Sequence, residues 1–239
     1  MENKVNAIVV RCVDYKDNDK MLTLYSLEKG LIGAGIKGVK KATAKLAFAA
    51  QPFCFAEYVL SVNGDRNTVV GATEIESFYK LRLNLHTYYC ASTICEFVLK
   101  CAQENFADEK LFVLTVNAIK QLNFGEKNAK RILCEFLFKA LELLGYGIDC
   151  RGCAVCGKSC KEGELSFFDF EKGLLICEKC EYSGVTRLLT QTAVGLESLQ
   201  NGAQLNDESY NYLLKFFNYY LEQKTGETLK CLPQLLSLQ

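Results

Sequence analysis

The sequence predicts an α+β protein in which a small five-stranded barrel precedes a helical domain that carries an inserted cysteine-rich module. Three observations predict it. Short apolar segments separated by turn residues fill the first 80 residues, the apolar period then lengthens from about two to about 3.6 residues, and two C-x2-C pairs occur after residue 150. We therefore expect a domain at 1–80 and another at 81–239, with the module at about 150–182.

The amino-terminal segments are rich in Val, Ile, Leu and Tyr, which are typical of half-buried strands. Asn63-Gly64 is a strong hairpin signal between two of them. The five expected strands are 5–13, 21–27, 31–39, 53–62 and 68–75. So few strands in so short a region favour a closed barrel of the OB-fold type, and an SH3-like barrel would give much the same pattern.

Helical spacing of apolar residues begins at Leu81, and a second helix is expected after Asp108. The third helix, 127–144, is apolar on nearly all sides, so we expect it at the buried centre of a bundle. Two more helices are expected near 190–200 and 207–224.

Cys153 and Cys156 form one C-x2-C pair, and Cys177 and Cys180 form a second pair after twenty intervening residues. Each pair directs two thiolates toward one point, and the long loop returns the second pair, so the spacing predicts one tetrahedral Zn²⁺ site. The alternation over 164–176 predicts a small hairpin between the pairs. Four protein ligands leave no position for substrate, so this zinc is expected to be structural.

A second interpretation of the cysteines is an iron–sulfur cluster. Cys150, Cys153, Cys156 and Cys160 spell the C-x2-C-x2-C-x3-C run of bacterial ferredoxins, with Lys161 in place of its proline. A disulfide scaffold is disfavoured, because the total of 13 cysteines is odd and no secretory leader is recognisable. The scattered cysteines are expected to pack as small hydrophobic residues.

Net charge is zero, with 28 basic and 28 acidic residues, so any nucleic-acid surface must come from the distribution of charge. No acidic residue occurs between Glu28 and Glu57. That window contains Lys29, Lys37, Lys40, Lys41 and Lys45. The lysines are densest at the expected end of the third strand, which borders the groove of an OB-type barrel, where they would neutralise phosphates. A solvated loop that keeps an edge strand soluble is the alternative.

Candidates for catalysis are few. Residues 33–38 match the dinucleotide fingerprint G-x-G-x-x-G, and Glu57 stands near the position of its ribose-binding acid, but the glycines lie in an expected strand. The single histidine, His86, begins an expected helix and is better explained as a structural residue than as a base. No P-loop and no long apolar span occur. We therefore expect a cytoplasmic protein that is not an enzyme, with an oxidoreductase as the alternative.

Three stretches have a joint order and spacing that are specific to one family. They are DKMLTLYS with EKG at 19–30, IKGVKK at 36–41 with AQPF at 50–53, and LLGYGID at 143–149 before CAVCG at 153–157. In these stretches the chain resembles the RecO family of bacterial recombination-repair proteins, and the resemblance covers essentially its full length.

The resemblance implies an OB-fold, a helical domain and a zinc ribbon in a nucleoid-associated protein that binds single- and double-stranded DNA. It further implies that the protein anneals complementary strands and cooperates with RecR to load the recombinase onto DNA coated with single-strand-binding protein. The family's DNA-contacting segment maps onto Lys37, Lys40 and Lys41, with Lys45 and Arg11 as additions. Lysine in place of arginine preserves phosphate attraction but makes bidentate contacts less favourable. A zinc-stabilised adaptor without direct DNA contact is the second hypothesis.

Overall fold

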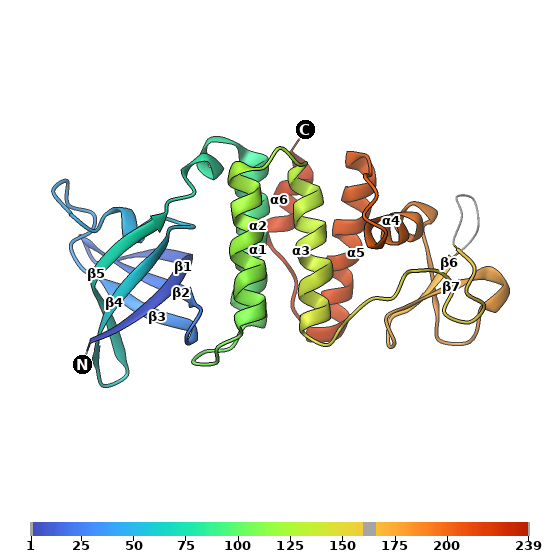
Figure 1. The fold of residues 1–239 in the computed structure, drawn as a ribbon, viewed down its shortest axis with the longest axis horizontal. Coiled ribbons are helices and arrows are strands. Elements are labelled where there is room, and N and C mark those ends of the chain that lie inside the picture. Colours follow the sequence, from blue (N-terminus) through green and yellow to red (C-terminus); the bar gives the residue numbers. More distant parts are fainter. Residues whose placement is uncertain (1, 160–165, 239) are drawn as a thin grey trace. The chain divides into compact units, whose positions relative to one another are not determined.

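The computed structural model describes residues 2–159 and 166–238. The chain divides into two compact units, Met1–Glu126 and Lys127–Ser237. The first unit contains a β-barrel and two helices, and the second contains the remaining helices and a small cysteine-bearing sheet (Figure 1). The domain boundary expected at residue 80 lies inside the first unit, between the barrel and its two helices, and stays a prediction.

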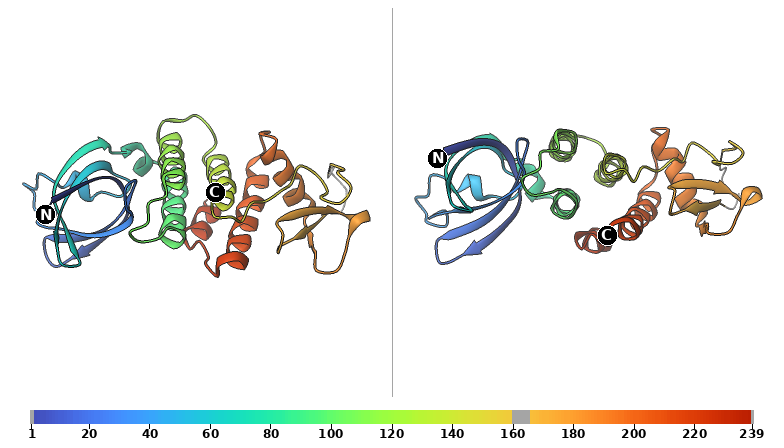
Figure 2. Two further views of the ribbon diagram at one scale, coloured as in Figure 1. Left: turned by 60° about the horizontal axis from the view of Figure 1, so that its bottom comes forward. Right: turned by 90° about the horizontal axis from the view of Figure 1, so that it is seen from below.

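The first unit begins with five strands that close into a barrel. They are β1 (Glu2–Tyr15), β2 (Asp19–Ser26), β3 (Gly30–Ile36), β4 (Phe55–Asn63) and β5 (Arg66–Glu76). Their order is β1-β2-β3-β5-β4, and β1 pairs with β4 to complete the closure (Figures 1 and 2). Only β3 and β5 run parallel. This five-stranded closed barrel confirms the predicted fold class.

Alternating residues of the first four strands fill the barrel interior, as the period of two requires, and β5 adds Val69. On β3, for example, Ile32, Ala34 and Ile36 are buried in the barrel core. The strand ends at Ile36, three residues before its expected end, because the Gly38 N–H donates to the Asp19 carboxylate at 2.8 Å. Gly38 has a φ of 69°, a left-handed conformation that glycine adopts without strain, and it turns the chain away from the sheet.

The segment between β3 and β4 is a folded cap on the barrel. It contains the 3-10 turn η1 (Phe48–Ala50), and the Tyr58 hydroxyl donates to the Ala49 carbonyl at 3.0 Å. Val39, Ala49 and Ala50 all belong to the barrel core. The lysines of this segment are therefore carried by a loop whose apolar residues are fixed on the barrel.

Two capped helices follow the barrel in the same unit. The turn η2 (Tyr79–Leu83) precedes α1 (Leu85–Cys101), and α2 is Glu109–Phe124. Asn84 caps α1 by accepting from the His86 and Thr87 amides, so this helix starts four residues after the expected Leu81. Asp108 caps α2 in the same way. Phe112 of α2 packs on Tyr25 of the barrel, with ring centroids 5.5 Å apart.

The described part of the second unit contains four helices. They are α3 (Ala129–Leu143), α4 (Thr190–Gln200), α5 (Asp207–Thr225) and α6 (Cys231–Ser237). α3 and α4 both pack against α5. α3 buries most of its apolar residues but exposes Lys139, Glu142 and Leu143, so the expectation that it is apolar on nearly all sides was wrong for its last turns.

The cysteine-bearing sheet lies between α3 and α4 in the sequence. Its strands are β6 (Ser166–Asp169), β7 (Leu174–Cys177) and β8 (Thr186–Leu188), in the order β7-β6-β8. Phe167 packs in the cysteine cluster, while the next residue, Phe168, contacts Phe216 of α5 with ring centroids 5.1 Å apart. Among the described residues, no helix is both long and apolar enough to cross a membrane.

Candidate metal centre and nucleic-acid interface

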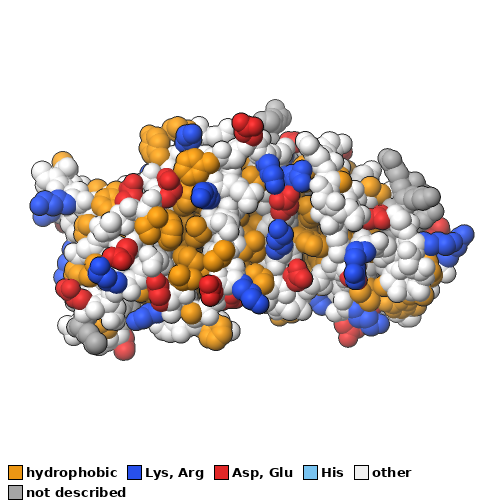
Figure 3. All heavy atoms as spheres, in the orientation of Figure 1, with side chains coloured by type: hydrophobic (Ala, Val, Ile, Leu, Met, Phe, Trp, Pro, Cys, Tyr) orange, Lys and Arg blue, Asp and Glu red, His pale blue; other side chains and the backbone are white. Residues whose placement is uncertain are grey.

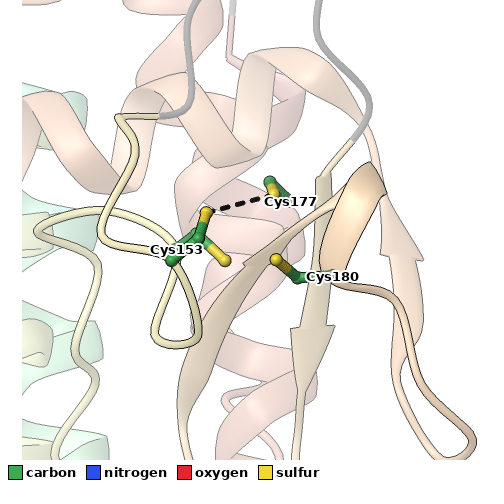
Figure 4. A group of neighbouring side chains, drawn as sticks. Cys153, Cys177 and Cys180 are labelled. Atoms are coloured by element: carbon green, nitrogen blue, oxygen red, sulfur yellow. Dashed lines mark hydrogen bonds between the residues drawn. The ribbon is translucent and has the colours of Figure 1, made fainter.

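The four predicted cysteines lie together. The sulfur atoms of Cys153, Cys156, Cys177 and Cys180 are all within 4.8 Å of one another, and those of Cys156 and Cys177 are 3.7 Å apart. Figure 4 shows the labelled sulfurs of Cys153, Cys177 and Cys180 pointing toward a common centre. A tetrahedral site with Zn–S bonds of about 2.3 Å places its sulfurs about 3.8 Å apart. The cluster therefore fits a metal ion of this type.

Local backbone geometry positions the first cysteine pair. The Gly157 N–H donates to the Cys153 carbonyl at 2.8 Å, and the Cys153 N–H donates to the Lys158 carbonyl at 2.8 Å. Gly157 has a φ of 73°, which allows this tight turn without strain. The second pair spans the end of β7 and the short turn η3 (Glu178–Cys180). One tight turn and one strand end thus bring the four sulfurs to one point.

Electrostatics at the cluster favour a bound cation. Burial raises the pKa of the Cys153 thiol, but backbone hydrogen bonds from Cys177, Cys156 and Val155 outweigh it and lower this pKa to about 6. Hydrogen bonds with Cys156 and Cys177, together with burial, raise the pKa of Cys180 to about 12. A divalent metal that binds here would displace the thiol protons, because thiolates are its ligands.

The ferredoxin-like run is not assembled among the described residues. Cys150 is buried, and its thiol donates to the Leu196 carbonyl at 3.2 Å and to the Gln200 side-chain oxygen at 3.0 Å. Its sulfur is therefore engaged by α4 and is not part of the four-sulfur cluster. Cys160 lies outside the described residues. The cysteines that decide between the two interpretations are Cys177 and Cys180, which the cluster includes and the run omits.

A groove of about 690 Å³ lies on the outer face of the barrel. Three elements enclose it: the turn between β1 and β2, the outer faces of β2 and β3, and the turn between β4 and β5. These are the face and loops with which OB-folds bind oligonucleotides. Four cations line the groove, namely Lys16, Lys20, Lys37 and Arg66, with Asp19 and Asp65 among them.

Of the five basic residues expected to bind DNA, only Lys37 lines the groove. The Lys40 ammonium instead donates to the Asp14 carboxylate at 2.8 Å. Lys41, Lys45 and Arg11 are exposed but do not line it. Sequence reasoning missed Lys16, Lys20 and Arg66. The signal that could have found these is that Lys16 and Lys20 lie between the first two expected strands and Arg66 lies beside Asn63-Gly64, because the turns of an OB-type barrel border its groove.

Asp14 acts as an internal counter-ion. The hydrogen bond from Lys40 lowers the pKa of the Asp14 carboxyl, which also lies 3.9 Å from the Lys20 ammonium. The carboxylate thus holds a position that a phosphate could take between two lysines. Positive and negative side chains are interspersed over the visible face of the barrel (Figure 3), so attraction of a polyanion depends on the local groove and not on a broad positive field.

The dinucleotide interpretation fails on local structure. Gly33 and Gly35 lie within β3, and the next element is the short turn η1. The fingerprint requires a helix whose amino terminus receives the pyrophosphate, and none follows this strand. His86 is half-buried in the first turn of α1, where its amide donates to the cap residue Asn84.

Comparison with known proteins decides the family. The profile described as "Recombination protein O N terminal" matches residues 1–78, and the profile described as "Recombination protein O C terminal" matches residues 82–233. The chain belongs to the RecO family. Together the two profiles cover the barrel, the helices and the cysteine-bearing sheet, so the family resemblance seen in the sequence is confirmed.

Similar RecO proteins cover nearly the whole chain. The "DNA repair protein RecO" of Clostridium novyi (strain NT) is 26% identical over 232 residues, which span 92% of this chain and 90% of the relative. That of Desulforamulus reducens is 29% identical over 238 residues, covering 94% and 92%. That of Pelotomaculum thermopropionicum is 34% identical over 177 residues, covering 74% and 68%. These relatives are all described as DNA repair proteins, and the chain spans at least 68% of the length of each.

Proposed function

We propose that this protein is a recombinational repair mediator that binds DNA in the barrel groove, anneals complementary strands and helps to load a recombinase. Membership of the RecO family supports the repair role. The single observation that carries the DNA site is the convergence of Lys16, Lys20, Lys37 and Arg66 on one groove. We extend the binding surface to Lys40, Lys41, Lys45 and Arg11, which lie outside the groove and would contact a longer strand.

The mechanism that we propose is electrostatic. The cations neutralise phosphates, release their counter-ions and hold a strand with little sequence selectivity. Two DNA strands held near the same protein have a raised local concentration, and the cations screen the repulsion between their phosphates. Annealing is therefore accelerated. No covalent step is required, in agreement with our proposal that the protein is not an enzyme.

We propose that the metal is one structural Zn²⁺ held by Cys153, Cys156, Cys177 and Cys180. The sulfur spacing and the thiolate character of Cys153 support zinc. When bound, the ion supplies folding free energy to the sheet. Four cysteine ligands would complete a tetrahedral coordination sphere, so the ion would join the turn at 153–157 to the end of β7 and to η3.

The partners that we propose are RecR, single-strand-binding protein and both single- and double-stranded DNA, in the cytoplasm and in association with the nucleoid. Family membership supports these partners. A zinc-stabilised adaptor without DNA contact is the second candidate. It is favoured by the exposed apolar side chains of Tyr79, Leu83 and Phe124 in the first unit, where Lys80 lies 5.8 Å from the Phe124 ring centroid.

A salt titration of single-stranded DNA binding tests the proposal. Replacing Lys37 and Arg66 together by alanine should weaken binding and reduce the slope of log K against log salt by about 1.4, because each phosphate contact to a single strand contributes about 0.7. The matched control is Lys110→Ala with Lys120→Ala, two exposed lysines of α2. An unchanged slope in the groove variant would reject the site, and wild-type protein that is not retained by DNA at low salt would favour the adaptor.

A further inference from the structure

The floor of the groove lacks side chains along one strand. β3 buries Ile32, Ala34 and Ile36, so the residues between them, Gly33 and Gly35, belong to its outer face. Both glycines line the groove. Across the ladder, Gly33 pairs with Thr23 of β2 and Gly35 pairs with Met21. The result is a strip of bare backbone in the middle of the cationic groove.

The fold does not require glycine at these positions. A Cβ added to Gly33 would meet no atom within 4 Å, and one added to Gly35 would make an ordinary contact of 3.5 Å with the Met21 sulfur. Neither residue has a positive φ. Glycine inside a strand weakens it and often marks a place where a ligand approaches the backbone closely. Packing and backbone conformation therefore leave these two glycines unexplained, whereas an occupant of the groove explains them.

The surroundings of the strip fit the face of an unpaired base. Tyr15 and Met21 line the groove with 49% and 38% of their surface exposed. The Lys16 ammonium lies 5.3 Å from the centroid of the Tyr15 ring. The Asn67 amide donates to the Gly33 carbonyl at 3.0 Å, so this carbonyl already has a partner. An aromatic ring beside a cationic groove is the combination that stacks bases and holds phosphates in single-strand sites, and the bare strip leaves space for a base against the backbone.

We propose that Gly33 and Gly35, with Tyr15, form a stacking floor that makes the groove selective for single-stranded over double-stranded DNA. This inference rests on the proposed function, because it assigns a strand type to the same groove. In a duplex the bases stack on one another and the phosphates lie outside, so a duplex reaches only the cationic rim. A single strand turns unpaired bases onto the floor. Stacking occupies the faces of the bases and leaves their pairing edges free for a complement.

Gly33→Val tests the floor directly. Its side chain would project into the groove without a clash at the Cβ, and a β-branched residue suits a strand. Gly71→Val on β5 is the matched control, because Gly71 does not line the groove and its Cβ would make only an ordinary contact of 3.5 Å with Val59. Tyr15→Ser is a second variant that removes the ring without filling the groove.

The measurement is the affinity of the full-length protein for an oligothymidylate and for a duplex of equal length at one salt concentration. Gly33→Val and Tyr15→Ser should each weaken single-strand binding roughly 10-fold and change duplex binding by less than about two-fold, whereas Gly71→Val changes neither. The proposed stacking floor would be overturned if both variants bound single-stranded DNA with unchanged affinity, or if they lost equal affinity for single-stranded and duplex DNA. Wild-type protein that binds neither form would overturn the proposed function as well, so the two failures are distinguishable.

Discussion

The barrel and the cysteine-bearing sheet are stabilised in different ways. Sixteen buried residues form the barrel core, whereas the described part of the cysteine cluster has four, of which two are the proposed ligands Cys153 and Cys177. The barrel can therefore leave glycines and charges on its outer face. The small sheet has little apolar core in its cysteine cluster, so the proposed metal would supply stability there. The proposed DNA-binding surface and the proposed metal centre therefore belong to separate regions with separate energetic requirements.

The largest expected effect comes from removing a metal ligand. Cys153→Ser should lower the free energy of unfolding by at least about 3 kcal/mol and reduce the zinc content to near zero, because metal binding contributes folding free energy. Cys12→Ser is the control, since Cys12 donates to the Ala50 carbonyl at 3.2 Å and serine can do the same. Metal analysis and thermal unfolding would measure both. A Cys153 variant with normal melting would contradict a structural metal.

A smaller effect is expected at Asp169, which ties the sheet to the turn after η3. Burial alone would raise the pKa of this carboxyl, but the Tyr182 hydroxyl, which donates to it at 2.6 Å, and the Lys172 amide outweigh burial and lower it. Tyr182→Phe should therefore lower the free energy of unfolding at pH 7, because it removes a hydrogen bond to a charged group. Denaturant unfolding of this variant and of the control Tyr219→Phe, which changes an exposed tyrosine of α5, measures the loss.

The same pair has a defined pH dependence. The pKa of Asp169 is lower in the folded protein, so its stabilisation is complete above the ordinary carboxyl pKa of about 3.9 and is lost as the pH falls through the folded value. The difference between wild type and Tyr182→Phe should accordingly be constant from pH 7 to pH 5 and shrink in stronger acid. A difference that grows on acidification would show that Tyr182 does not act through the carboxylate.

The smallest expected effect sharpens the barrel side of the comparison. Asp14→Asn removes the carboxylate that binds Lys40 and approaches Lys20, so single-strand binding should tighten about two- to five-fold and the salt slope should steepen. Asp17→Asn changes net charge equally in the neighbouring turn and serves as the control. Equal gains in DNA affinity in the two variants would show that the effect comes from net charge alone. No gain in affinity for Asp14→Asn would show that Lys40 does not contact DNA.

The sequence predicted the four-cysteine cluster more completely than the groove, for a physical reason. C-x2-C spacing places two cysteines within one turn, so all four cysteines that lie together could be named from the pattern. The groove instead gathers Lys16, Lys37 and Arg66 from three turns that meet only when β3 pairs with β5. No local pattern encodes that closure.

Two further features could not be derived from local patterns. Lys40 pairs with Asp14, which is 26 residues away in the sequence, with strands β2 and β3 between them. The strand expected from Phe53 begins at Phe55, because Phe53 has a φ of 67° in the bend before it. Strand number and type were thus predictable, while strand ends and long-range ion pairs required the folded barrel.

Hydrogen exchange with and without a single-stranded oligonucleotide tests the central claim most directly. If the groove is the DNA site and the metal centre is a brace, added DNA should slow amide exchange in residues 15–21, 33–37 and 63–68 and leave the amides of 150–159 and 174–182 unchanged. Protection confined to the cysteine-bearing sheet, with none in the groove, would contradict this account.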